Sequence, residues 1–155
     1  MAIGNWIMFD KAKQKVWNGG LDLDTDTIKV AFFRTSAALT RASGSIWSQL
    51  VGEISATGGY ASHGYALAGL SVKAGTSAGQ TVFTHAAKVI SAVAGALTNI
   101  RYAVLVDESK GTSGGNRPII GFCALSTAQF TVTSGNTITL NPPTPGVFDL
   151  TGATA

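Results

Sequence analysis

Apolar and polar residues alternate along much of the chain after residue 21, which is the period of β-strands that expose one face to water. The first such strand is predicted around Ile28, Val30 and Phe32, whose side chains share one face and make it a half-buried strand. Further strands are predicted at Gly64–Val72, Gln80–Ile90, Ile100–Asp107, Pro118–Ala124, Phe130–Thr133, Thr137–Leu140 and Val147–Leu150. Clusters of glycine, serine, threonine and asparagine separate these segments and indicate turns.

Residues 130–140, FTVTSGNTITL, have the pattern of a β-hairpin whose three-residue loop is centred on Gly135. Its two strands would face each other through Phe130, Val132, Ile138 and Leu140. Seven or eight short strands without intervening helical patterns predict a mainly β fold, either an antiparallel β-sandwich or a barrel-like arrangement. A chain of 155 residues fits a single domain with one continuous core.

The beginning of the chain has a different period. Residues 5–18, NWIMFDKAKQKVWN, place four apolar side chains on one helical stripe roughly 100° wide: Trp6, Phe9, Val16 and Trp17. Two consecutive glycines then end the predicted short helix, because glycine readily adopts the left-handed conformation common at helix C-termini. The sequence therefore predicts an N-terminal arm and amphipathic helix in residues 1–20 and a β-domain in residues 21–155.

Two lysines, Lys11 and Lys15, lie on the helix face opposite the aromatic stripe. This separation has two interpretations: the helix packs on its own domain, or it is an arm that docks on a partner. In the second interpretation the aromatic side chains anchor the interface and the lysines meet acidic groups. The predicted partner interface then consists of Trp6, Phe9, Lys11, Lys15 and Trp17.

The composition changes the picture in one respect, because only 12% of the residues are charged, about half the ~25% of an average domain. With 45% hydrophobic residues and a net charge of +3, the chain does not have the composition of a disordered protein. A surface poor in charge favours coverage by neighbouring subunits, as in an assembly. The small basic excess does not indicate nucleic-acid binding. The apolar runs are too short to span a bilayer, so membrane insertion is not predicted. The N-terminus lacks the basic region of a signal peptide, so secretion is not predicted either.

The pattern G-x-S-x-G occurs at residues 75–79 and 111–115 and raises the question of an esterase. A nucleophile elbow needs its serine on a turn between a strand and a helix, whereas β-type sequence follows both Ser77 and Ser113. No histidine follows Ser113, and no aspartate separates Ser77 from His85, so the order of a catalytic triad is not met. The sequence therefore predicts no catalytic residues and no enzyme activity.

Metal and cofactor sites are not predicted either. His63 and His85 have no ligand spacing typical of zinc or iron, and no phosphate-binding glycine motif occurs. The residues Asp22, Asp24 and Asp26 are similar to the opening of a calcium loop but lack its turn glycine and final glutamate, which favours a plain turn over a weak cation site. A single cysteine, Cys123, allows no intrachain disulfide and reads as a buried small hydrophobe, compatible with assembly in a reducing cytoplasm.

Four segments together resemble one known family: GGLDLDTDTIKVAFF, SIWSQLVGEISATGGYASHGYALAGLSV, RYAVLVDES and RPIIGFCAL. With the basic amphipathic N-terminus and the final strands, they are similar to the head decoration proteins of tailed bacteriophages, also called cement or minor capsid proteins. The resemblance covers nearly the whole chain and rests on structural residues, with the glycines around Tyr60 and Tyr65 spaced differently.

The resemblance implies a mainly β virion protein that binds the outside of a phage capsid and stabilises the shell. It implies the major capsid protein as partner, a homotrimer as the oligomer, and the capsid surface as the location after assembly in the host cytoplasm. Two other functions stay open: a tail, collar or fibre-attachment component, and a small glycan-binding module. For the last, Trp47, Tyr60 and Tyr65 would form an aromatic platform for a sugar.

Overall fold

The computed structural model describes residues 4–111 and 115–151 and is mainly β, with antiparallel strand pairing throughout the described sheets. Its strands are β1 (Ile7–Met8), β2 (Ile28–Phe33), β3 (Tyr65–Ala66), β4 (Ser71–Ala74), β5 (Gln80–Thr84), β6 (Lys88–Ser91), β7 (Leu97–Ile100), β8 (Tyr102–Asp107), β9 (Ile119–Ala124), β10 (Phe130–Val132), β11 (Thr137–Leu140) and β12 (Phe148–Thr151). The helices are α1 (Asp10–Trp17) and two short 3₁₀ turns, η1 (Thr35–Ala37) and η2 (Trp47–Gln49). The predicted fold class is confirmed in its sandwich form.

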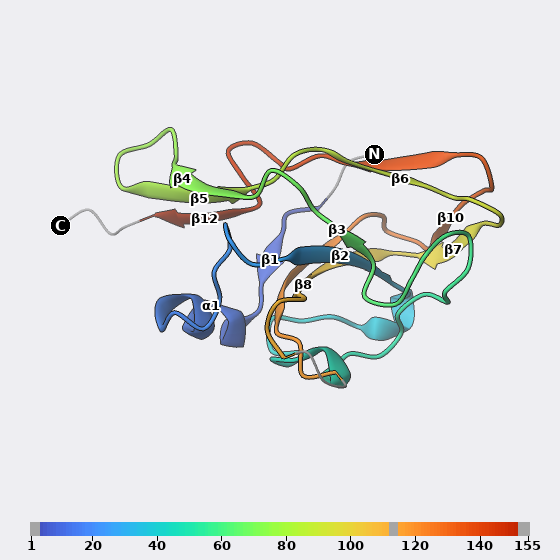
Figure 1. Cartoon of the computed structure of the whole chain (residues 1–155), viewed down its shortest axis with the longest axis horizontal. Helices are drawn as coiled ribbons and strands as arrows, with labels where there is room; N and C mark the ends of the chain where they lie inside the picture. Colours follow the sequence, from blue (N-terminus) through green and yellow to red (C-terminus); the bar gives the residue numbers. More distant parts are fainter. Residues whose placement is uncertain (1–3, 112–114, 152–155) are drawn as a thin grey trace.

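One long, interrupted hairpin forms most of the structure. Strands β5 to β8 make one arm and β9 to β12 the other, and they pair in order: β8 with β9, β7 with β10, β6 with β11 and β5 with β12. The loops between the paired segments bend this ribbon back over the sheet that contains β8 and β9. In Figure 1 the strands β4, β5, β12 and β6 consequently run above β1, β2 and β8, while α1 lies below them.

The predicted hairpin over residues 130–140 is wrong. Strand β10 pairs with β7 and β11 pairs with β6, so the two segments do not face each other. The peptide N–H of Gly135 instead donates to the Ala92 carbonyl oxygen at 2.8 Å, which makes the glycine loop a bend inside the ribbon. Local sequence encoded the turn correctly, because Gly135 has φ +85°, but the strand partners come from residues 88–100.

The central sheet has the order β1-β9-β8-β2-β3 and is buried on both faces. Strand β2 was predicted to be half-buried, yet Ala31 and Phe33 on its second face are as buried as Phe32 on the first. The ring of Phe33 packs edge-on against Trp47 at 5.3 Å, and that of Phe32 stacks with Tyr60 at 6.1 Å. The half-buried prediction is wrong because the loop after β2 supplies a cover that alternation alone does not reveal.

Tyr60 fixes this loop to the central sheet through its hydroxyl group. The Phe32 peptide N–H donates to Tyr60 Oη at 3.1 Å, and the hydroxyl donates in turn to Glu53 Oε1 at 2.7 Å. Burial, together with the Glu53 carboxylate, raises the pKa of Tyr60 and keeps the phenol neutral. The chain then passes so close to β2 that a side chain at Gly64, which has φ +77°, would collide with the Val30 carbonyl group.

The N-terminal helix is shorter than predicted. Residues before Asp10 form an edge of the central sheet, where Ile7 lies opposite Phe122 and the Phe9 peptide N–H donates to the Ile120 carbonyl oxygen at 3.0 Å. The apolar run before the helix is therefore strand, and the predicted helix start at residue 5 is wrong. The end of the helix is as predicted, because Gly19 adopts φ +74° directly after it.

The tip of the long hairpin is organised by a buried carboxyl group. Asp107 is 0% exposed and accepts peptide N–H groups from Ser109 at 2.8 Å and Lys110 at 3.2 Å through Oδ1. Its neighbour Asp26, in the turn before β2, forms an ion pair with Lys110 at 3.3 Å. Burial first, and then the nearby carboxyl group of Asp26, raise the pKa of Asp107 to about 6.

We predict that Asp107→Asn flattens the pH dependence of stability. Unfolded, this carboxyl group titrates near 3.8, so between pH 4 and 6 the folded protein holds a proton that the unfolded chain has released. Stability contributed by this group therefore falls as pH rises through that window, by on the order of 1–2 kcal/mol. Asparagine keeps the oxygen that accepts the two peptide N–H groups and carries no titrating proton, so the variant should lose this slope and be more stable than wild type at pH 7.

Urea unfolding of both proteins at pH 4, 5, 6 and 7 measures the difference. Asp10→Asn, which removes an exposed carboxylate from the first turn of α1, controls for the loss of one negative charge. Parallel stability curves for wild type and Asp107→Asn across the window would contradict the raised pKa of Asp107.

Candidate functional site

A cleft separates the N-terminal segment from the three-stranded sheet of β12, β5 and β4. It consists of two adjoining grooves that share Met8 and Phe148. The edge groove, about 450 Å³, is lined by residues 5–8, Lys13, Arg41 and residues 143–149. The helix groove, about 360 Å³, is lined by Met8, Val16, Gly19, Leu21, Asp22, Leu23, Asp24, Val72, Thr81, Phe83 and Phe148.

Strand register builds the apolar wall of this cleft. Val72 of β4 and Phe148 of β12 both lie opposite Phe83 of β5, so one row of apolar side chains crosses the three strands. The rings of Phe83 and Phe148 stack at 6.0 Å, and Trp6 meets Phe148 edge-on at 6.4 Å. Phe148 can come this close to the central sheet because Gly121 has no side chain, and a Cβ atom there would lie 2.5 Å from the Phe148 ring.

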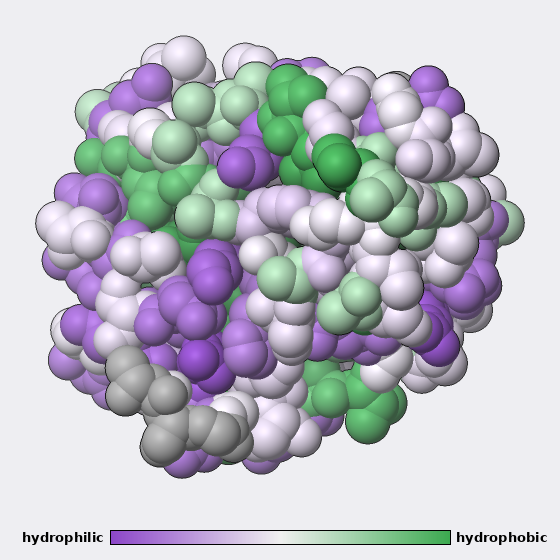
Figure 2. Space-filling model, turned by 45° about the vertical axis from the view of Figure 1, so that its right-hand side comes forward, coloured by the Kyte–Doolittle hydropathy of each residue, from purple (hydrophilic) through white to green (hydrophobic). Residues whose placement is uncertain are grey.

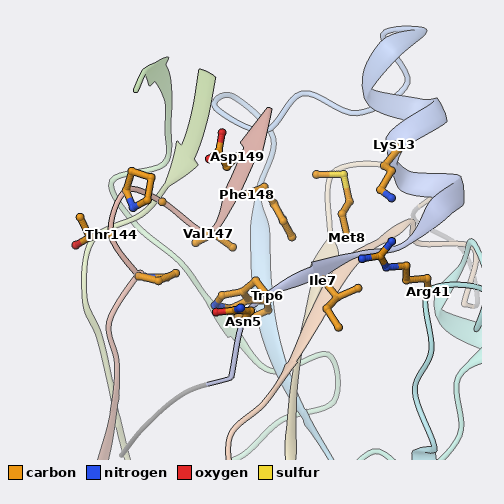
Figure 3. Close-up of a pocket in the computed structure, with 13 residues that line it drawn as sticks. Asn5, Trp6, Ile7, Met8, Lys13, Arg41, Thr144, Val147, Phe148 and Asp149 are labelled. Carbon is orange, nitrogen blue, oxygen red and sulfur yellow. The ribbon is translucent and has the colours of Figure 1, made fainter. Parts of the chain in front are cut away.

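The edge groove combines this apolar floor with separated charges. Figure 3 shows Lys13 and Arg41 on one side, Asp149 on the other, and Trp6 and Phe148 between them. Lys13 Nζ lies 3.3 Å from Asp10 Oδ1 in an exposed pair along the helix. Asp149 Oδ2 accepts a hydrogen bond of 2.6 Å from Gln80 Nε2. The side with Lys13 and Arg41 is therefore the positive wall of the groove.

The predicted interface residues do not form one surface. Trp6 is half-buried and lines the edge groove, whereas Phe9 is 0% exposed and its ring packs on Phe122 at 5.1 Å. Phe9 is therefore a core residue, and its prediction as a partner contact is wrong. Trp17, by contrast, is 79% exposed at the end of α1.

The two predicted lysines lie on the helix. Lys11 is exposed and Lys15 is partly buried, with Lys15 Nζ 3.5 Å from the Ser45 carbonyl oxygen. Arg41 and Phe148 also line the cleft and were not predicted from the sequence, because only long-range folding brings them there. The apolar run at residues 6–9 was the available signal for an edge strand, but the helical period of residues 5–18 predicted a helix there.

The other chemical motifs resolve into structural roles. Ser77 lies in the turn between β4 and β5, so a strand-to-helix elbow is not formed there, while Ser113 lies outside the described residues. Burial raises the pKa of the Cys123 thiol to about 12, as expected for a small core side chain. Across the described ranges, no group of three or more His, Cys, Asp or Glu side chains could hold a metal ion.

The three acidic residues before β2 form the predicted turn. The Asp26 peptide N–H donates to the Asp22 carbonyl oxygen at 3.1 Å, and Asp26 Oδ2 accepts the Asp22 peptide N–H at 3.0 Å. The Asp26 carboxylate and this backbone bond thus close the turn before the chain enters the central sheet.

The predicted aromatic platform for a sugar is not present. Trp47 and Tyr60 are buried, and Tyr65 is half-buried with its ring 5.6 Å from that of Tyr60. Trp47 and Tyr60 belong to the loop after β2 and pack on the central sheet instead of presenting a flat exposed face. The platform was predicted from aromatic residues alone, and their burial with Phe32 and Phe33 gives them a place in the core.

Comparison of the chain with protein-family models, with curated proteins and with solved structures finds no match. Within the part of the chain that the structure describes, no helix has the length and apolar character needed to cross a membrane.

We predict very different losses of stability for two aromatic residues that the sequence grouped together. Phe9→Ala should destabilise the isolated protein by about 3–5 kcal/mol, because it leaves a cavity in the core. Trp17→Ala should change the free energy of unfolding by less than about 0.5 kcal/mol, because the side chain is exposed. Chemical denaturation of the two variants and wild type tests both values, and equal losses would contradict the placement of Trp17.

Proposed function

We propose that the protein is a structural virion component that binds the outside of a tailed-phage capsid and stabilises the shell as a decoration protein. The observation that carries the proposal is the 79% exposed Trp17, which follows Val16, a residue of the apolar helix groove. The resemblance described above supplies the capsid context, and the physical properties of this surface support a docking role.

Trp17 and the helix groove have complementary properties for docking. An exposed tryptophan can insert into a pocket on a partner, and buried aromatic anchors commonly carry a large part of an interface's binding energy. The helix groove, with a volume of about 360 Å³ and a lining that includes Leu21, Leu23 and Phe83, can in turn accept an apolar side chain of the partner. Lys11 and Lys15 lie on the same helix and would increase the rate of association with an acidic shell.

The rest of the surface suits broad, neutral contacts. Figure 2 shows large areas of intermediate hydropathy, with hydrophilic and hydrophobic residues gathered in separate patches. This agrees with a charged fraction of only 12%. We propose a homotrimer that contacts the major capsid protein at several points, because multivalent attachment strengthens interfaces that are individually weak. We further propose assembly in the host cytoplasm and a final location on the capsid surface.

Gold-labelled antibodies against the chain, applied to intact virions whose genome encodes it, should label the heads. Virions assembled without the chain should bind added wild-type protein, whereas the affinity of Trp17→Ala for them should be about thirtyfold lower, the loss expected from removing an anchor worth about 2 kcal/mol. The matched control is Val51→Ala, which removes another exposed apolar side chain, 67% exposed, outside α1.

Labelling of tails or collars alone would replace the capsid assignment with a tail, collar or fibre-attachment function. If no part of the particle is labelled, the virion proposal is overturned. Equal losses of binding for Trp17→Ala and Val51→Ala would contradict docking through the end of α1.

A further inference from the structure

We propose that the edge groove binds an extended peptide segment of another protein that carries an acidic side chain, and that this segment adds as a strand between β1 and β12. The inference concerns a surface different from the Trp17 surface and does not depend on the capsid function. It rests on the open strand edges, the apolar floor and the charges of the groove.

The first step is the position of the two strands. β1 is an outer strand of the five-stranded central sheet, and β12 is an outer strand of the three-stranded sheet. Residues of both line the edge groove, so two sheet edges border the same cavity. Proteins usually cover or interrupt such edges, because an unpaired edge offers backbone donors and acceptors to any extended chain.

The register of β1 shows where its free backbone groups point. The Phe9 peptide N–H donates to the Ile120 carbonyl oxygen, so Phe9 and Ile120 are a hydrogen-bonded pair. Such pairs recur at every second residue of an antiparallel ladder, so Ile7 and Phe122 are the next one. Met8, between them, is opposite Gly121 in a non-hydrogen-bonded pair. Its peptide N–H and carbonyl groups are therefore directed away from β9, to an edge that is open at Met8 and ends at Asp10, whose peptide N–H donates to the Arg41 carbonyl oxygen at 3.1 Å.

The second step is the apolar floor. On one side of the floor, Met8 belongs to β1 and Trp6 directly precedes that strand. On the other side, Phe148 begins β12 and Val147 directly precedes it. A strand placed over this floor would direct every second side chain into it and the others to solvent. The volume of about 450 Å³ lies within the range of preformed ligand sites. Backbone pairing with alternate side-chain pockets is the general mode of peptide recognition by strand addition.

The third step is charge. Lys13 and Arg41 form the positive wall, and Arg41 takes part in none of the ion pairs found among the described residues. A guanidinium group matches a carboxylate in a bidentate, charge-assisted hydrogen bond. Asp149 on the opposite wall already accepts a hydrogen bond from Gln80 and would repel a second carboxylate. The acidic side chain of the bound segment must therefore face Arg41 and Lys13.

Panning a library of random linear ten-residue peptides on the immobilised protein tests the proposal. Enriched sequences should alternate apolar residues with at least one Asp or Glu. The best peptide should bind the Lys13→Gln/Arg41→Gln double variant at least about tenfold more weakly, the effect of one charged hydrogen bond. Lys73→Gln/Lys88→Gln removes two lysines that do not line the groove and should leave peptide affinity unchanged. N-methylation of alternate peptide amides should abolish binding, because strand addition needs them as donors.

The protein's own amide signals locate the bound peptide. On peptide addition, NMR signals of residues 5–8 and 143–149 should move and exchange of the Met8 amide should slow. Enrichment without acidic residues, full binding by the Lys13/Arg41 double variant or tolerance of N-methylation would overturn the proposal. So would failure to enrich any peptide, or a wild-type dimer that protects the Met8 amide, since the groove would then be occupied by a second copy.

Discussion

Burial of the central sheet on both faces is the constraint on which the rest of the structure depends. Four consecutive residues of β8, Ala103 to Val106, are 0% exposed, which requires a cover above and below the sheet. The folded-back ribbon supplies the upper cover. The loop after β2 supplies part of the lower one through Trp47, and Ala12 of α1 is buried with them in one continuous core. Removing apolar surface from water in this way is the main favourable contribution to folding, at about 25 cal/mol per Å².

Both grooves result from this folding back. The ribbon leaves the central sheet at β7 and β10 and returns over it, so β12 ends beside the N-terminal segment instead of beside its sequence neighbours. The contact of Trp6 with Phe148 joins the two sheets there, and the missing side chain of Gly121 permits it. The cleft is therefore a consequence of how two sheets with different strand orders meet, and its edges stay open because neither sheet continues across it.

The sequence predicted the fold class, most strand positions and the end of the helix, because alternation and glycine are local signals. Partner choice is not local: Gly135 indicated a turn, but only residues 88–100 could show that its flanking strands pair elsewhere. The helical period at residues 5–18 hid an edge strand, since Trp6 and Phe9, three residues apart, fit a helical stripe although they point to opposite faces of a strand. The sequence predicted Trp6 as a site residue but not Arg41 or Phe148. These two are distant from Trp6 in the chain and line the same groove only after folding.

Hydrogen exchange of individual amides in the isolated protein tests the central claim most directly, namely a sheet covered on both faces that retains an open edge at β1. Protection reports which backbone groups are held inside stable structure. The account predicts the slowest exchange for amides of β2, β8 and β9, and fast exchange for the Met8 amide although its neighbours Ile7 and Phe9 are protected by β9. A Met8 amide as protected as those of β8, or rapid exchange within β2, would contradict it.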